Sequence, residues 1–552
     1  MANEHVDVVI VGAGAGGGVV AKELSAAGLS VVLFERGDWV NYSDHRDDEL
    51  TSQRGFPLKP FFGPDMQRYR RVAVDRDGTE RIVYPNEWAY GNIAACVGSG
   101  TVAYGAMAWR FMQEDFTMKS TYGEVEGSSL ADWPIGYQDL EPYYEKAEWE
   151  IGVSGDDSKN PFAPPRKKPH PMPAFGHNRE ARILEAGARK AGFHPFSIPM
   201  LRNSEPYQGR GQCIHVRNCV GFACRVNAKN GTHNTVIPTA LATGNCDLRV
   251  NCKVAKILTN SKGRVTGVSY FDEHDQLREQ TADIVVLAAS ATETPRLLLN
   301  SASTHHPNGI GNKYDWVGRN LQDHAYTGAD GLFAEDIYDD VGPGASVAIC
   351  DFAHNNPGIV GGAMLANDFI PLPYAFTKVR PPGSARWGRD HKEFQRRNFH
   401  RRASIRGPIQ EMPNFESRVQ VSDEVRDHWG IPVVKLSGYR LDQDMEAAKF
   451  IADKAAQWLE AAGAVDIWKS LPGLGVGASQ HQAGTCRMGD DPQSSVTNKY
   501  GQVHGIDNLY IADGSLHVTN GAFNPVLTIM ALGYWVSEHI LKEHGPPLPR
   551  EV

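Results

Sequence analysis

Two segments late in the chain carry side chains that could do chemistry. Ser479 to Gly489 reads SQHQAGTCRMG and contains His481, while Leu509 to Ala531 contains Asp513-Gly514 and then Asn524-Pro525. A strand that ends in Asp-Gly-Ser can hydrogen-bond ribityl or phosphate groups. The helix that begins after Asn524 can direct its positive N-terminal dipole at a group that becomes negative, such as the N1–C2=O region of a flavin during reduction.

The start of the chain contains a unit that would position such a cofactor. Val8 to Val11 is a β-branched apolar run that predicts a buried parallel strand, and G-x-G-x-x-G follows from Gly12 to Gly17. These glycines allow a tight turn, close approach of a pyrophosphate and packing of the next helix on the strand. A helix over 19–27, a strand over 30–34 and the acceptor carboxylate of Glu35 complete the unit. It predicts a dinucleotide site, either for FAD or for NAD.

Length, charge and composition limit the other classes. A chain of 552 residues is too long for one core, so we expect two large or interleaved domains. The net charge of −9 argues against nucleic acid and gives no help toward an anionic membrane. No apolar run approaches the ~20 residues of a membrane helix, and MANEH lacks a secretion signal. Eight cysteines are few for this length, which indicates a cytoplasmic protein.

The later segments indicate an α/β Rossmann-like domain interleaved with an α+β substrate domain built on an antiparallel sheet. We place the first domain at 1–155, 205–325 and 475–552, and the second at 156–204 and 326–474. Strands that complete the first domain are expected at 248–258, 265–271 and 284–288. Short alternating strands of the second are expected at 347–350, 418–421 and 433–436. We interpret the irregular basic stretch Lys378 to Arg406 as a solvated lid over the active site, with recruitment of an anionic partner or membrane as the alternative.

In combination, these motifs resemble the glucose–methanol–choline (GMC) family of flavoprotein oxidoreductases over nearly the whole chain. The segments that carry the resemblance are the glycine unit with Glu35, Gly98 to Arg110, DWPIGYQDLEPYY at Asp132 to Tyr144, VGRNLQDH at Val317 to His324, and the segments of His481 and Asn524. Within the family, the sequence looks most like bacterial pyranose or glycoside oxidases and FAD-dependent sugar dehydrogenases. The resemblance implies FAD rather than NAD in the dinucleotide site.

The resemblance also implies roles for individual residues. His481 would be the general base that accepts the hydroxyl proton while the carbinol hydride moves to flavin N5, and Asn524 would hydrogen-bond the same hydroxyl. The ordinary histidine pKa of ~6.5 suits this role near neutrality. His517 lies in the same loop, where we expect a surface or supporting role. The expected cofactor-binding residues are Gly12, Gly14, Ala15, Gly17, Glu35, Arg36, Gly98, Thr101, Val254, Ala289, Asp513, Gly514, Pro525 and Thr528.

Two departures from the family pattern bear on the cofactors. Covalent members of the sugar-oxidising branch carry a flavin-bonding histidine where this sequence has Ala103, so we predict non-covalent FAD. Related dehydrogenases carry an iron–sulfur cluster near the position of Cys213, Cys219 and Cys224. Thiolate ligation usually uses compact spacings, whereas this spacing is C-x₅-C-x₄-C. We therefore expect reduced thiols and no metal, with a cluster as the alternative.

The expected reaction is oxidation of a secondary hydroxyl, at C2 or C3 of a pyranose or glycoside, to a keto-sugar. Oxygen would be the acceptor and peroxide the second product. One alternative is a sugar or polyol dehydrogenase that passes electrons to a quinone-like molecule, a dye or a cytochrome; another is a redox-silent FAD lyase. The sequence contains neither a zinc-ligand pattern nor a hydrolase triad context, so metal and acyl-transfer chemistry are not supported.

Overall fold

The first of three sheets is built around the strand that precedes the glycine turn. The computed structural model describes residues 5–40, 48–52, 63–475 and 480–545. Two positions used in the sequence analysis lie outside these ranges. They are residues 1–4, at the start of MANEH, and Ser479 of the SQHQAGTCRMG segment. The parallel strands of the first sheet come from distant parts of the chain: β1 (Val6–Val11), β2 (Val31–Phe34), β6 (Cys246–Arg249), β9 (Leu277–Leu287) and β17 (Leu509–Ile511). Two antiparallel strands, β8 (Val265–Phe271) and β7 (Lys253–Thr259), extend its other side.

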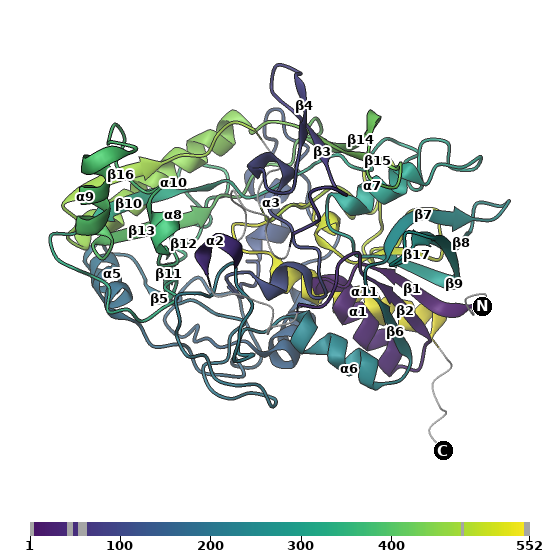
Figure 1. Cartoon of the computed structure of the whole chain (residues 1–552), viewed down its shortest axis with the longest axis horizontal. Coiled ribbons are helices and arrows are strands. Elements are labelled where there is room, and N and C mark those ends of the chain that lie inside the picture. The colour runs from purple at the N-terminus through teal and green to yellow at the C-terminus, as the bar shows by residue number, and fades with distance from the viewer. Residues whose placement is uncertain (1–4, 41–47, 53–62, 476–479, 546–552) are drawn as a thin grey trace.

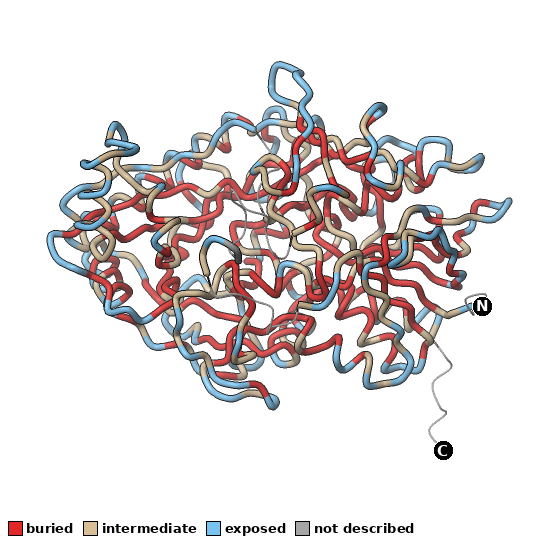
Figure 2. Tube along the Cα trace, in the orientation of Figure 1, coloured by how far each residue is buried: buried red, intermediate tan, exposed pale blue. Residues whose placement is uncertain are grey.

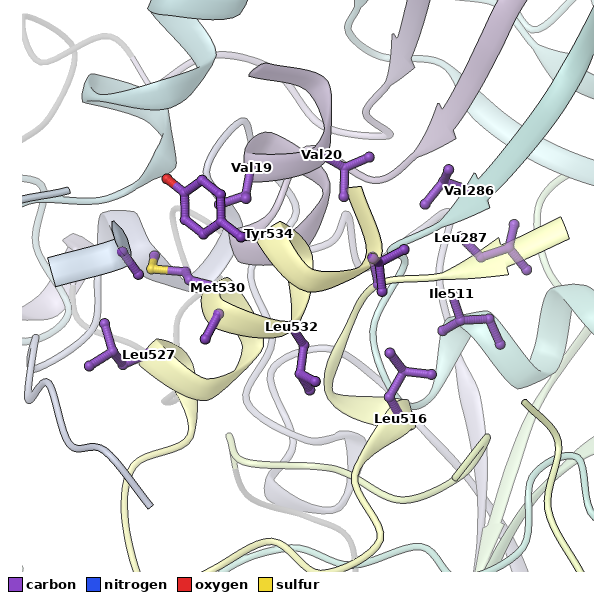
Figure 3. Packing of buried hydrophobic residues seen from close by; sticks show 14 of the residues in the cluster. Val19, Val20, Val286, Leu287, Ile511, Leu516, Leu527, Met530, Leu532 and Tyr534 are labelled. Atoms are coloured by element: carbon purple, nitrogen blue, oxygen red, sulfur yellow. The ribbon is translucent and has the colours of Figure 1, made fainter. Parts of the chain in front are cut away.

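Helices α1 (Ala15–Ala26) and α11 (Val526–His544) pack together against this sheet (Figure 1). Figure 3 shows Val19 of α1 beside Tyr534 of α11, with Leu287 of β9 and Ile511 of β17 in the same apolar cluster. The two helices approach closely because α11 has Gly533 at the contact, where a Cβ would lie 3.2 Å from the Cβ of Val19. The C-terminal helix therefore belongs to the same core as the N-terminal glycine unit.

The second sheet has six strands, and its neighbouring strands pair antiparallel throughout. Its order is β16 (Asp466–Ser470), β10 (Tyr326–Leu332), β13 (Arg402–Pro408), β12 (Leu365–Asn367), β11 (Val347–Ile349) and β5 (Phe196–Ser197). Helices α10 (Asp442–Ala461) and α5 (Arg179–Lys190) cover one face, where Ile405 joins an apolar cluster with Ile451 and Trp458. Figure 1 shows this sheet at the end of the molecule opposite the first one.

A third sheet differs from expectation. β14 (Arg418–Arg426) and β15 (Pro432–Ser437) were expected in the sheet of the substrate domain, but β15 pairs with β3 (Arg71–Val74), and β3 pairs with β4 (Glu80–Val83). Alternation identifies a strand without specifying its partner, so the separate sheet with β3 and β4 was not foreseen, and the assignment of β14 and β15 to a domain stays a prediction. Figure 1 shows the third sheet beside α7 (Glu293–Asn300) of the Rossmann-like part.

Two further expectations are corrected. The basic stretch 378–406 is not irregular, because it contains α9 (Gly388–Asn398) and most of the central strand β13. The single strand expected over 248–258 is two strands, interrupted at Asn251, whose φ of +54° lies in the left-handed region. The remaining α-helices within the described residues are α2 (Glu49–Ser52), α3 (Met118–Tyr122), α4 (Tyr137–Ala147), α6 (Val236–Ala242) and α8 (Pro373–Phe376).

Overall, the fold is an α/β Rossmann-like part joined to an α+β part on an antiparallel sheet, as the sequence predicted. Buried backbone fills the centre, and exposed segments lie at loop tips such as the turn between β3 and β4 (Figure 2). Within the described ranges, no helix is both long and apolar enough to cross a bilayer. The exact domain boundaries stay a prediction.

Candidate active site

One cavity of about 990 Å³ connects the glycine turn to His481 and Asn524. Most of the expected cofactor residues line it: Gly12, Gly14, Ala15, Glu35, Arg36, Thr101, Val254, Ala289, Asp513, Gly514 and Pro525. Gly17, Gly98 and Thr528 are not among the lining residues. The fold therefore places segments from both ends of the chain around one space.

The glycine turn has the tight geometry that its sequence demands. Gly12 has a φ of +107°, and a Cβ there would lie 2.4 Å from the carbonyl oxygen of Ala288. A Cβ on Gly17 would lie 1.9 Å from the carbonyl oxygen of Gly12, so Gly17 serves helix–strand packing and not the cavity wall. Helix α1 begins at Ala15 without a side-chain cap and without an acidic residue in its first turn. Its N-terminus therefore suits a phosphate.

Glu35 is buried at the end of β2, and its carboxylate accepts hydrogen bonds from the backbone N–H groups of Ala13 (3.1 Å) and Gly37 (2.9 Å). Burial raises the pKa of Glu35 above its ordinary value, and these backbone donors oppose the rise. The carboxylate is thus fixed at the cavity wall, where a ribose hydroxyl could donate to it. The neighbouring Arg36 is held by Glu293 at 3.4 Å.

Asp513 ties two strand ends together beneath the cavity. Its carboxylate accepts from Thr294 Oγ1 (2.6 Å), Ser290 N (3.0 Å) and Ser515 N (2.9 Å). Burial raises the pKa of Asp513, and these donors work against that rise. Asp513 therefore locks the end of β17 to the turn after β9.

The other expected residues outside the cavity wall have structural roles. Gly98 has a φ of +88°, and its N–H donates to the carbonyl of Ala13 at 2.8 Å, which holds its loop against the glycine turn. Thr528 is buried in the first turn of α11 and pairs with the Tyr144 hydroxyl at 2.8 Å. Both residues therefore hold the segments that line the cavity without lining it themselves.

His481 and Asn524 lie close together at the other end of the cavity, together with His324 and Tyr326. His481 Nδ1 lies 2.9 Å from His324 Nδ1, and His481 Nε2 lies 3.4 Å from Asn524 Nδ2. Asn524 Nδ2 also donates to the Tyr326 hydroxyl at 3.0 Å. The backbone N–H of His481 donates to Asp323 at 3.2 Å. Four polar side chains therefore surround one point in the cavity.

The carbonyl group of Gly521 determines which ring nitrogens of His324 and His481 carry hydrogen. His324 Nε2 lies 2.9 Å from the Gly521 carbonyl oxygen, which can only accept, so Nε2 carries the hydrogen. Burial lowers the pKa of His324, so its ring is neutral at pH 7 and Nδ1 is an acceptor. His481 then donates from Nδ1 and bears its lone pair on Nε2, where Asn524 donates. We assign these tautomers from the hydrogen-bond partners.

The amide oxygen of Asn524 is buried and has no hydrogen-bond partner among the described residues. Buried polar atoms are nearly always paired, and an exception in a cavity wall indicates a group that a ligand completes. The cavity end thus offers a lone pair on His481, an N–H donor and an acceptor on Asn524, and the Tyr326 hydroxyl. This set matches a hydroxyl group that must be both held and deprotonated.

Sequence reasoning assigned no role to His324 or Tyr326. His324 ends the VGRNLQDH segment and Tyr326 begins β10, so their place directly before a strand was the available signal. The surface alternative for His517 was wrong: the ring is fully buried between Phe111 and Trp133, and its Nδ1 lies 3.1 Å from Asn520 Oδ1. Its loop folds inward because Asn520 also donates to the His481 carbonyl at 2.7 Å.

Ala103 and the three clustered cysteines were the points that concerned covalent and metal cofactors. Ala103 lines the cavity, where its methyl group offers no atom for a flavin bond. All eight cysteines, Cys213, Cys219 and Cys224 included, are free thiols. In the part of the chain that the structure describes, no group of three His, Cys, Asp or Glu side chains is arranged to hold a metal ion.

The parallel sheet with its glycine turn is typical of a dinucleotide-binding protein, and the cavity that begins at this turn ends at His481 and Asn524. The model for GMC oxidoreductases matches residues 97–326 with its N-terminal part and 413–533 with its C-terminal part. A model for NAD(P)-binding Rossmann-like domains matches residues 10–59. The chain therefore belongs to the GMC oxidoreductase family of FAD-binding flavoproteins that act on CH–OH groups.

Individual relatives agree with this assignment. The large subunit of fructose dehydrogenase from Gluconobacter japonicus is 29% identical, over 98% of this chain and 99% of that protein. The 6'''-hydroxyparomomycin C oxidase of Streptomyces lividus is 30% identical, over 95% of this chain and 89% of that protein. Among solved structures, formate oxidase from Aspergillus oryzae matches with a TM-score of 0.67 and 16% identity, over 99% of both chains. That likeness concerns the fold.

Proposed function

We propose that this chain oxidises a secondary hydroxyl, at C2 or C3 of a pyranose or glycoside, to a keto-sugar. The observation that carries the proposal is the convergence of His481 Nε2 with Asn524 Nδ2 and, through that amide, the Tyr326 hydroxyl, in the cavity that the glycine turn also lines. A carbohydrate substrate is supported by the fructose dehydrogenase and the aminoglycoside oxidase among the relatives.

The residues of the cavity fit FAD, which when bound would accept the hydride from the carbinol carbon. Gly12, Gly14 and the N-terminus of α1 would hold its pyrophosphate, and Glu35 would accept from its ribose. The N-terminus of α11 at Pro525 has no side-chain cap and no acidic residue in its first turn, so it can favour negative charge on the ring. Because Ala103 has no nucleophilic atom, we propose that the cofactor is bound without a covalent bond.

At the substrate end, His481 Nε2 would accept the proton of the hydroxyl that is oxidised. Asn524 would donate to the same hydroxyl oxygen and hold it against Nε2. His324 would keep the proton of His481 on Nδ1, so that Nε2 is the basic atom when the substrate arrives. General-base catalysis of this kind contributes roughly 10²- to 10⁴-fold to a rate.

For the electron acceptor, we propose oxygen with release of peroxide, supported by the similarity to a protein named as an oxidase. A dehydrogenase that passes electrons to a quinone-like molecule, a dye or a cytochrome is the second candidate, favoured by the similarity to fructose dehydrogenase. We further propose a cytoplasmic location without nucleic-acid or membrane partners, supported by the eight free thiols.

The test is a substrate panel on the FAD-loaded protein. Free sugars, O-glycosides and C-glycosides are added without oxygen, and loss of the oxidised flavin absorbance reports turnover of the reductive half-reaction. Identification of the new carbonyl then gives the position oxidised. Air is admitted next: reoxidation in seconds indicates an oxidase, and reoxidation over hours indicates a dehydrogenase. Absence of flavin reduction with every sugar would contradict the proposal.

A further inference from the structure

A row of charged side chains continues along the six-stranded sheet from Tyr326. Side chains of a strand alternate between its two faces, so Tyr326, Gly328 and Asp330 of β10 point to the same face. On β13, Arg406 lies opposite Gly328 and Ser404 lies opposite Asp330. Asp368 follows directly after β12, and its backbone N–H donates to the Ser404 carbonyl at 2.9 Å. Asp368 therefore lies beside Ser404, on the side of β13 away from β10.

The two faces of this sheet differ sharply in chemistry. The face that carries Ala329, Ala403 and Ile405 is packed on α10 in an apolar core. The opposite face carries the charged row, and Tyr326, Asp368 and Arg406 all line the cavity that also contains His481. Arg406 pairs with Gly328, which is two residues after Tyr326 on β10. The backbone of Arg406 therefore lies about 7 Å from that of Tyr326 along the strand direction. That distance is comparable to the width of a six-membered sugar ring.

Buried partners hold Arg406 in place. Its Nη2 donates to Asp330 Oδ2 at 2.8 Å, and its Nε donates to Ser404 Oγ at 3.0 Å. Asp330 is buried, which opposes its ionisation, but Arg402 and Arg406 outweigh this effect and hold its pKa below the ordinary value. The guanidinium is therefore fixed by an ionised carboxylate beneath it, while Nη1 makes no hydrogen bond to the described residues.

Asp368 lies beside this guanidinium but forms no hydrogen bond with it. Its Oδ2 is 3.8 Å from Arg406 Nε, beyond hydrogen-bond distance, and among the described residues its Oδ1 accepts only from the backbone N–H of Phe369 at 2.8 Å. Asp368 keeps acceptor capacity on a carboxylate that is about 41% exposed. The pair thus offers ionic acceptors and an ionic donor side by side in the cavity.

We propose that Asp368 and Arg406 form a subsite for the neighbouring hydroxyl groups of the substrate ring, away from the carbon that is oxidised. Two adjacent hydroxyls would donate to the Asp368 carboxylate, and Arg406 Nη1 would donate to one of their oxygens. The inference rests on the proposed function and deepens it, because it selects a ring that carries a vicinal diol over a simple alcohol. Hydrogen bonds to charged groups of this kind discriminate strongly against analogues that lack the hydroxyl.

The test compares methyl glucoside, which carries neighbouring hydroxyls, with cyclohexanol, which has the same ring size and one hydroxyl. Anaerobic flavin reduction in the FAD-loaded protein gives an apparent Kd and a limiting rate for each. We expect Asp368→Asn and Arg406→Gln to raise the apparent Kd for methyl glucoside by roughly 10- to 100-fold, with a smaller change in limiting rate. The values for cyclohexanol should stay within about twofold.

The matched control is Arg401→Gln, which removes an arginine next to β13 whose partner is the surface residue Asp336 at 2.8 Å. It should change neither substrate. Equal losses for both substrates in Asp368→Asn, or no loss for methyl glucoside, would overturn the subsite.

Calorimetric binding of methyl glucoside to the same proteins separates this inference from the proposed function. If no sugar reduces the flavin, the proposed function fails; wild-type binding that Asp368→Asn weakens would still support the subsite. If the wild-type protein does not bind methyl glucoside at all, or if Asp368→Asn binds it as tightly as wild type, the subsite is wrong.

Discussion

The Nδ1 atoms of His324 and His481 face each other at 2.9 Å, and the far nitrogen of His324 is held by the carbonyl of Gly521. A carbonyl can only accept, so this one contact sets the tautomers of both rings and leaves the lone pair of His481 on Nε2. A backbone group on the loop before α11 therefore orients a side chain of a different segment. His324 acts here as a positioning residue.

The first prediction concerns this relationship. His324→Ala removes the acceptor, so His481 can adopt either tautomer, and we expect the limiting rate of flavin reduction to fall roughly 10- to 100-fold. His324→Asn keeps an acceptor near the position of Nδ1 and should recover part of the loss. A merely structural role would affect thermal stability and substrate affinity together with the rate. If His324→Ala reduces flavin as fast as wild type, the positioning role is wrong.

The second prediction concerns the amide of Asn524. Asn524→Asp replaces the N–H donor by a carboxylate that cannot donate when ionised, and it also brings a negative charge close to the basic nitrogen. We expect a fall of at least roughly 10-fold in the limiting rate of flavin reduction, because a hydrogen bond to the reacting hydroxyl is lost. Asn524→Gln retains the amide and serves as the control. A rate for Asn524→Asp within twofold of wild type would contradict the assigned role.

The third prediction concerns the glycine turn. In Gly12→Ala the new Cβ would meet the Ala288 carbonyl oxygen at 2.4 Å, at a φ of +107° that alanine rarely adopts. We expect the purified variant to contain far less FAD than wild type, by absorbance of the released cofactor. Gly176→Ala, where nothing lies within 4 Å of the added Cβ, is the matched control. Far-ultraviolet circular dichroism checks that Gly12→Ala is folded. Full FAD occupancy in Gly12→Ala would refute the prediction.

The fourth prediction concerns pH and stability. Burial lowers the pKa of His517 to about 4, whereas the unfolded chain would have the ordinary value of about 6.5. The unfolded state then binds more protons, so the folded state loses about 3 kcal/mol as the pH falls from 6.5 to 4. His517→Gln should flatten this part of the curve of unfolding midpoint against pH. His274→Gln, at an exposed position, should leave the curve unchanged. An unaltered curve in His517→Gln would show that this ring does not titrate on unfolding.

How much could be predicted from the sequence depended on how local the signal was. The strand, turn and helix at Gly12 to Gly17 were predictable because the glycine spacing itself encodes the turn: a Cβ on Gly17 would meet the Gly12 carbonyl, and a Cβ on Gly12 would meet Ala288 at the end of the neighbouring strand. The pairing of β15 with β3 was not, because alternation specifies a face and leaves the partner strand open. The contact of Asn524 with Tyr326 joins residues 198 positions apart, and it exists because both sheets contribute to one cavity.

The site followed the same division. His481 and Asn524 were identified because their segments resemble a family, and the fold brings them within reach of each other. His324 was given no role and His517 was allowed a surface position, because the sequence of a loop does not reveal whether its histidine points into the protein. The burial of both rings is set by the loop from Asp513 to Asn524, whose carbonyl and amide groups they contact.

The central claim is that His481 Nε2 takes the proton of a sugar hydroxyl. Its most direct test is single-turnover flavin reduction by the best sugar of the panel, in FAD-loaded wild type and His481→Ala at matched pH and substrate saturation. The account predicts reduction in wild type and a limiting rate lower by roughly 10²- to 10⁴-fold in the variant, with FAD content unchanged. Equal limiting rates in the two proteins would contradict it.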